Sequence, residues 1–164
     1  MLRSSAMKRR KARRKQRRKP RRRRATPAAP LASPPPTEAE RQLLALAREL
    51  AALGADPLPR AIDLLAAAYA PEAPLPSALQ QAWLAGRGNK TAVLALAWAR
   101  EQVRLALEEM LGAARAGDVR GALGVSVHTH AWLVLAACEA LAQEPPSAVP
   151  DRVRALAELT GAVR

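Results

Sequence analysis

The sequence predicts an all-α protein, a helical bundle of about six helices preceded by a disordered basic tail. Ala and Leu lead the helix-propensity scale and supply most of the apolar residues. Strand-forming aromatic residues are scarce, with no Phe, one Tyr and three Trp. Capping residues, prolines and glycines divide residues 37–164 into six segments whose apolar positions follow helical spacing.

Charge divides the chain into two parts. Fifteen of the 27 Lys and Arg residues lie within the first 24 positions, and all 14 acidic residues follow position 37. Residues 37–164 therefore carry a net charge of about −2, and the net +13 of the chain comes from the tail. We treat residues 1–36 as an Arg/Lys-rich and then Pro-rich tail, and residues 37–164 as one helical domain.

The tail is a polycation with almost nothing apolar to bury. Charge repulsion and the prolines that follow predict an extended, disordered segment. Such an arm binds phosphates without reading bases, and no aromatic residue interleaves its charges for stacking on single strands. Alternatively, the tail is a low-complexity extension, or Met7 is the initiator. The expected nucleic-acid-binding residues are Lys8, Arg9, Arg10, Lys11, Arg13, Arg14, Lys15, Arg17, Arg18, Lys19, Arg21, Arg22, Arg23 and Arg24.

The first three expected helices span 37–54, 57–70 and 77–85. Thr37 and Glu40 can form a capping box at the start of the first helix, which a glycine ends. A proline in the first turn begins the second helix, and another proline ends it. The side chains expected to face the core are Leu43, Leu46, Leu50, Ile62, Leu65, Tyr69, Leu79 and Trp83.

A long fourth helix is expected from a cap at Asn89 to about residue 116, followed by a glycine-rich loop over 117–124. Its Arg100, Arg104 and Glu108 follow one another in steps of four residues. Side chains at that spacing are neighbours on a helix surface. We expect them to form a solvated edge held by salt bridges.

The fifth expected helix, 126–143, is apolar on almost every side. Such a helix must be covered all round, and a body of six helices covers one side. A second copy of the chain is expected to cover the rest, with help from a last helix over 151–160. The expected homodimer interface comprises Trp132, Val134, Leu135, Cys138, Leu141, Val153 and Leu156.

The order and spacing of these segments resemble a known family. The residues that carry the likeness read AWLAGRGN at 82–89, AWARE at 97–101, LEEMLGAARAGD at 107–118 and WLVLAACEAL at 132–141. The pattern resembles the C-terminal ligand-binding and dimerisation domain of TetR-family transcriptional regulators. The resemblance implies an all-α regulatory domain in which the last two long helices of each protomer pair into a four-helix bundle.

The resemblance also implies a transcriptional regulator that responds to a small apolar effector. That family reads DNA with an N-terminal helix-turn-helix, but residues 1–36 hold no periodic apolar positions for one. We therefore expect action through partners or through the basic arm. The alternative is a DNA- or RNA-associated adaptor that uses the tail for phosphate affinity. The expected effector-binding residues, which could equally be plain core, are Tyr69, Trp83, Trp98, Met110 and His128.

Other classes of function find no support in the sequence. His128 and His130 lie two residues apart and point in different directions on a helix, so we expect no metal site. No phosphate-binding loop or Gly-x-Ser-x-Gly motif occurs, and we expect neither an enzyme nor a cofactor. A single cysteine fits a reducing bacterial cytoplasm. No apolar run reaches the roughly twenty residues of a membrane span.

Overall fold

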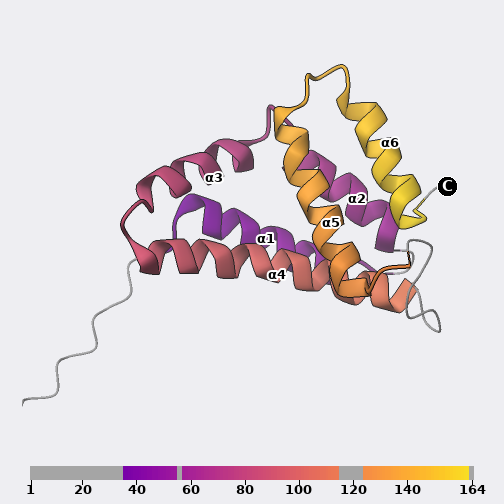
Figure 1. Cartoon of the computed structure of the whole chain (residues 1–164), viewed down its shortest axis with the longest axis horizontal. Coiled ribbons are helices and arrows are strands. Elements are labelled where there is room, and N and C mark those ends of the chain that lie inside the picture. The colour runs from indigo at the N-terminus through magenta and orange to yellow at the C-terminus, as the bar shows by residue number, and fades with distance from the viewer. Residues whose placement is uncertain (1–34, 55–56, 115–123, 163–164) are drawn as a thin grey trace, which may run out of the picture. The chain divides into compact units, whose positions relative to one another are not determined.

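The computed structural model describes residues 35–54, 57–114 and 124–162, and every regular element in these ranges is a helix (Figure 1). The all-α prediction is confirmed. The elements are α1 (Glu38–Ala51), α2 (Pro57–Ala68), α3 (Pro74–Ala85), α4 (Lys90–Ala114), α5 (Val127–Ala140), the 3₁₀ turn η1 (Leu141–Gln143) and α6 (Val149–Thr160). The predictions for residues 1–34 and for the loop at 117–123 lie outside the described residues.

The helix ends follow the capping chemistry of the sequence. The Thr37 hydroxyl accepts from the Glu40 amide at 3.3 Å, and the Glu40 carboxylate accepts from the Thr37 amide at 3.2 Å, which confirms the capping box. The Asn89 side chain accepts from the amide of Ala92 at 3.1 Å at the start of α4. Gly161 ends α6 with φ 72°, a left-handed conformation that favours glycine.

Two helices begin earlier than the sequence suggests, and in both cases the reason is proline. α3 begins at Pro74, three residues before the expected start, and α6 begins at Val149 with Pro150 in its first turn. Proline suits the first turn of a helix because its missing N–H would have no intrahelical acceptor there. At its carboxyl end α5 stops at Ala140, and the 3₁₀ turn η1 continues to Gln143, where the helix was expected to end.

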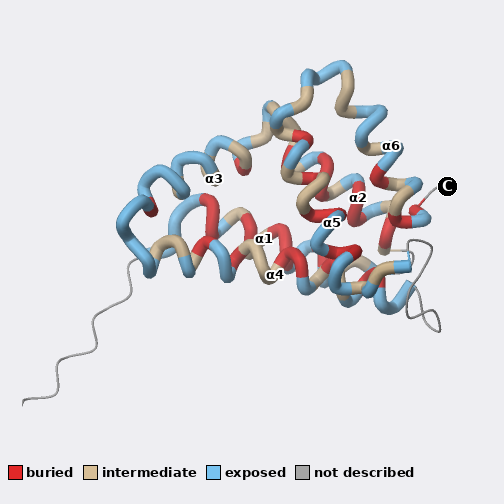
Figure 2. Tube along the Cα trace, viewed as in Figure 1, coloured by how far each residue is buried: buried red, intermediate tan, exposed pale blue. Residues whose placement is uncertain are grey.

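The core lies between α1, α4, α2 and α5. α1 packs along α4, α5 crosses α4, and α6 packs against α2 (Figure 1). Figure 2 shows the buried positions concentrated on α1, α2, α4 and α5, whereas most of α3 is exposed and its one buried residue is Leu75. The largest fully buried side chains include Tyr69, Leu43, Leu50, Ile62, Leu65, Leu96, Leu107, Leu111 and Leu135.

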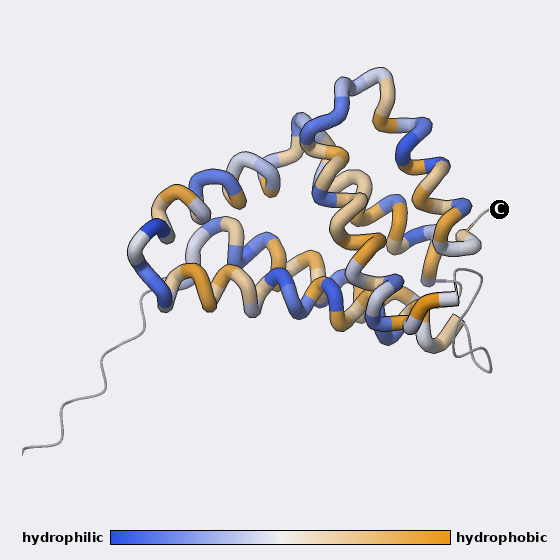
Figure 3. The backbone as a smooth tube through the Cα atoms, in the orientation of Figure 1, coloured by the Kyte–Doolittle hydropathy of each residue, from blue (hydrophilic) through white to orange (hydrophobic). Residues whose placement is uncertain are grey.

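Hydrophobic residues also occur at exposed positions of α4 and α5, as comparison of Figures 2 and 3 shows. On α4 these are Leu94, Trp98 and Leu105, and on α5 they are Trp132 and Leu133. Exposed single apolar residues are ordinary, but grouped ones mark surfaces that can bind something.

Candidate functional site

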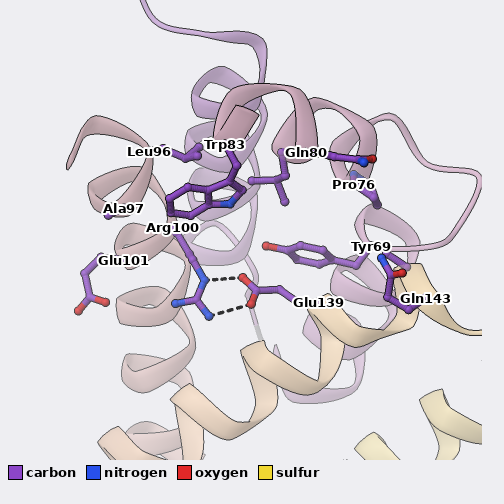
Figure 4. A pocket seen from close by; sticks show the side chains of 12 residues that line it. Tyr69, Pro76, Gln80, Trp83, Leu96, Ala97, Arg100, Glu101, Glu139 and Gln143 are labelled. Carbon is purple, nitrogen blue, oxygen red and sulfur yellow. Dashed lines mark hydrogen bonds and ion pairs between the residues drawn. The ribbon is translucent and has the colours of Figure 1, made fainter. Parts of the chain in front are cut away.

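An open cleft of about 610 Å³ lies where four elements meet. Its functional side chains are Tyr69 just after α2, Trp83 on α3, Arg100 on α4 and Glu139 on α5 (Figure 4). Leucine, proline and alanine side chains complete much of the wall. This combination of apolar walls and a few convergent polar groups is typical of small-molecule sites, and the volume lies in their usual range.

Tyr69 forms one end of the cleft. Its backbone amide donates to the Leu65 carbonyl at 2.9 Å, which continues the hydrogen bonding of α2 by one residue. The side chain is 1% exposed, and its hydroxyl has no hydrogen-bond partner among the described residues. Burial raises the pKa of the phenol, so the hydroxyl stays protonated and can donate. It points toward the space between Trp83 and the Arg100–Glu139 pair (Figure 4).

Arg100 and Glu139 form a two-pronged ion pair that links α4 to α5. Arg100 Nε and Nη2 donate to the two oxygens of Glu139 at 2.5 and 2.8 Å. This geometry is the strongest form of the arginine–carboxylate interaction. The hydrogen bonds to Glu139 raise the pKa of Arg100.

A second cluster of charges surrounds Arg104, one turn further along α4. Its guanidinium donates to Glu101 at 2.6 and 2.9 Å, to Glu108, and to Nδ1 of His128 at 3.0 Å. Arg104 is only 4% exposed. The expected salt bridge between Arg104 and Glu108 is confirmed, but Arg104 itself is buried rather than solvated.

This cluster should make the free energy of unfolding depend on pH in the acid range. Hydrogen bonds from Arg104 lower the pKa values of Glu101 and Glu108 below the ordinary 4.5. Carboxyl groups with depressed folded-state pKa values stabilise the fold above the unfolded value, and this stabilisation is lost as pH falls through the folded values. Arg104→Met should therefore cost about 1 kcal/mol at pH 7, a figure reduced for the partial exposure of both carboxylates.

The difference between wild type and Arg104→Met should shrink below about pH 4.5, when both carboxylates become protonated. Urea unfolding between pH 3 and 7 measures it. The matched control is Arg41→Met, because Arg41 pairs with Glu38 in an exposed i,i+3 contact that is worth little. Equal losses for the two variants at pH 7 would contradict this account of the buried cluster.

Two of the five expected effector-binding residues meet at the cleft. Tyr69 and Trp83 line it, although Trp83 was expected to face the core and is instead 46% exposed. The other three do not line this cleft. Trp98 is on the outer side of α4, Met110 is buried in the core, and His128 is exposed beside Arg104. The sequence analysis missed Arg100 and Glu139 because they are distant in sequence and belong to different helices.

The expected interface residues divide between the inside and the outside of the fold. Five of the seven are buried within their own chain; these are Val134, Leu135, Cys138, Leu141 and Leu156. The physical reason is that α5 packs its buried face on α4 and also contacts α6. Burial also raises the pKa of the Cys138 thiol to about 12, which makes it unreactive.

The opposite face of α5 is exposed within the chain. Trp132 is 49% exposed, Leu133 lies next to it, and Val153 on α6 is partly exposed. Between α5 and α6 the surface is hollowed by a groove of about 370 Å³ with alanine and leucine walls. The apolar surface of α5 is thus narrower than the sequence suggested, but it continues into the groove beside α6.

The outer side of α4 carries a second apolar surface that the sequence analysis did not single out. Leu94, Trp98 and Leu105 are exposed, and their spacing places them on one side of the helix. Trp98 and Leu105 border a groove of about 460 Å³ between α1 and α4. The helical spacing of these three residues could have indicated an apolar surface, but residues that face the core show the same spacing.

The described part of the chain holds no group of three or more His, Cys, Asp or Glu side chains suited to a metal ion. Within the same ranges, no helix combines the length and the apolar character that crossing a membrane requires.

Comparison with protein-family models, with curated proteins and with solved structures found no match to this chain.

Proposed function

We propose that the helical domain is the regulatory part of a TetR-like transcriptional regulator, which binds a small organic effector in the cleft and pairs with a second copy through α5. One observation carries the proposal. The Tyr69 hydroxyl is buried without a partner among the described residues at the end of an open, largely apolar cleft. A buried hydroxyl without a partner costs free energy, and a bound acceptor would recover it.

The position of the cleft supports a link between binding and pairing. Glu139 lies at the cleft, while Trp132 and Leu133 on the same helix face outward. A ligand that changes the Arg100–Glu139 contact would act directly on the helix that we propose to pair. Such a ligand regulates only if it binds the two conformations unequally.

Ligand binding at the cleft is tested by replacing one tryptophan at a time. A compound present at 100 times its dissociation constant should stabilise the wild type by about 2.7 kcal/mol, or roughly 10 °C in melting temperature. Trp83→Ala should abolish most of this shift, because Trp83 forms a cleft wall. Trp98→Ala is the matched control, since Trp98 is similarly exposed but lies on the outer side of α4.

A thermal-shift screen of small organic compounds against the three proteins provides the measurement. Compounds whose shift survives Trp83→Ala and is lost in Trp98→Ala would place binding between α1 and α4 and would contradict the proposal.

The second candidate function is a nucleic-acid-associated adaptor, which the charge distribution favours. The first 24 residues hold fifteen Lys and Arg, whereas residues 37–164 carry about −2. Removing residues 1–34 should abolish nucleic-acid binding together with its steep salt dependence, because released counterions drive such binding. Filter binding at several salt concentrations measures this. Sequence-specific DNA binding that persists in the truncated protein would contradict the adaptor function.

A further inference from the structure

The cleft offers a hydrogen-bond donor that no described side chain or backbone group uses. The Tyr69 phenol is buried, stays protonated and points into the cleft (Figure 4). An occupant that presents an oxygen or nitrogen lone pair to this hydroxyl removes the cost of the unpaired group. An occupant without an acceptor leaves that cost in place.

The charged groups at the cleft are already neutralised by partners of opposite sign. Both oxygens of Glu139 are taken by Arg100, and Glu101 accepts from Arg104 at 2.6 and 2.9 Å. An anion would meet a guanidinium whose charge Glu139 already balances, and it would lie close to that carboxylate, which repels it. A cation would approach Arg100 while both nearby carboxylates are engaged. Among these four side chains, neither an anionic nor a cationic ligand would find a partner of opposite charge that is not already paired.

The walls of the cleft favour a flat ring. Trp83 is about half exposed, and Figure 4 shows its indole beside the space that the Tyr69 hydroxyl faces. Leu79, Leu96 and Pro76 supply the remaining apolar surface. Aromatic rings stack in offset arrangements with tryptophan, and such contacts add to the free energy gained from area burial.

We infer that the cleft binds an uncharged, flat ring compound that carries a hydrogen-bond acceptor at one end. The ring lies against Trp83 and the aliphatic walls, and the acceptor meets the Tyr69 hydroxyl. This inference rests on the proposed function, since it names the chemical class of the effector. It differs from the sequence-based expectation of a merely apolar effector by the acceptor.

Four naphthalenes that share one ring system test the class. The probes are 2-acetylnaphthalene as the uncharged acceptor, 2-isopropylnaphthalene as the hydrocarbon of similar shape, 2-naphthoate as the anion and 2-naphthyltrimethylammonium as the cation. Equilibrium dialysis against the full chain, with each probe followed by its absorbance, gives the dissociation constants. Wild type is compared with Tyr69→Phe and with Trp83→Ala, and circular dichroism checks that each variant is folded.

The ketone should bind wild type about fivefold more tightly than the hydrocarbon, the ratio that one net hydrogen bond of about 1 kcal/mol provides. Tyr69→Phe should remove this advantage and leave hydrocarbon binding unchanged. Both charged probes should bind more weakly than the ketone. Trp83→Ala should weaken the ketone and the hydrocarbon alike, because it removes a wall rather than a donor.

Other outcomes overturn the inference in distinguishable ways. Equal affinity of ketone and hydrocarbon, or a ketone affinity that Tyr69→Phe leaves unchanged, would remove the acceptor requirement. A charged probe that binds more tightly than the ketone and is weakened by Trp83→Ala would contradict the uncharged class while leaving the cleft as a binding site. If none of the four probes binds in a Trp83-dependent way, the ligand class and the proposed effector site both fail.

Discussion

Leu135→Ala should lower the free energy of unfolding by about 2–5 kcal/mol, which is the range for removing a fully buried leucine side chain. Leu135 faces the interior on α5, and its loss leaves a cavity that the surrounding helices fill incompletely. A domain of this size is stable by about 5–15 kcal/mol, so the variant would lose a large share of that stability. Trp132→Ala, on the exposed face of the same helix, should change the stability of the isolated chain by less than about 0.5 kcal/mol.

Urea unfolding at two protein concentrations separates burial within one chain from burial between copies. The loss for Leu135→Ala should be the same at both concentrations. A loss for Trp132→Ala should appear only at the higher concentration, because pairing stabilises the folded state by mass action. If the loss for Leu135→Ala depended on concentration instead, Leu135 would belong to an interface, as the sequence first suggested.

Trp132→Glu should weaken self-association at least roughly thirtyfold, which corresponds to about 2 kcal/mol for a central aromatic residue of an interface. The substitution places a charge in apolar surroundings when two copies meet. It should leave the folded chain intact, because Trp132 is about half exposed within it. Sedimentation equilibrium over a range of loading concentrations measures the dissociation constant.

The matched control is Leu94→Glu, which places the same charge on an exposed apolar position of α4. This variant should associate like the wild type. Dissociation by Leu94→Glu but not by Trp132→Glu would move the interface to the outer side of α4, where Trp98 and Leu105 also lie. A wild type that remains monomeric at every concentration would contradict pairing altogether.

The sequence predicted the elements well because their ends depend on local chemistry. Thr37 with Glu40, Asn89 and Gly161 each act within a few residues along the chain, and each marks a helix end in the structure. The early starts of α3 and α6 were missed because proline was read as an interruption, whereas Pro74 and Pro150 occupy first turns.

Which side of each helix faces the core was harder to predict than where each helix begins and ends. α5 is apolar in nearly every direction, so the sequence contains no sign of which side packs on the chain's own core. That choice depends on where α4 and α2 lie. The result is that Leu135 is buried by its own chain whereas Trp132 is exposed.

The cleft was predicted only in part for the same reason. Tyr69 and Trp83 are large side chains with polar tips, which is a property of each residue alone. The Arg100–Glu139 pair joins helices 39 positions apart in the sequence, and no local spacing indicates it. Arg100 instead suggested an i,i+4 partner on its own helix, a contact that Arg104 makes with Glu108.

The three tryptophan indoles allow one direct test of the central claim that the cleft binds the effector. Trp83 lies at the cleft, Trp98 on the outer side of α4, and Trp132 on the exposed face of α5. In a ¹⁵N-labelled full chain, titration with 2-acetylnaphthalene should shift the indole N–H signal of Trp83 in a saturable way and leave that of Trp98 in place. A saturable shift of the Trp98 signal with none at Trp83 would contradict the account.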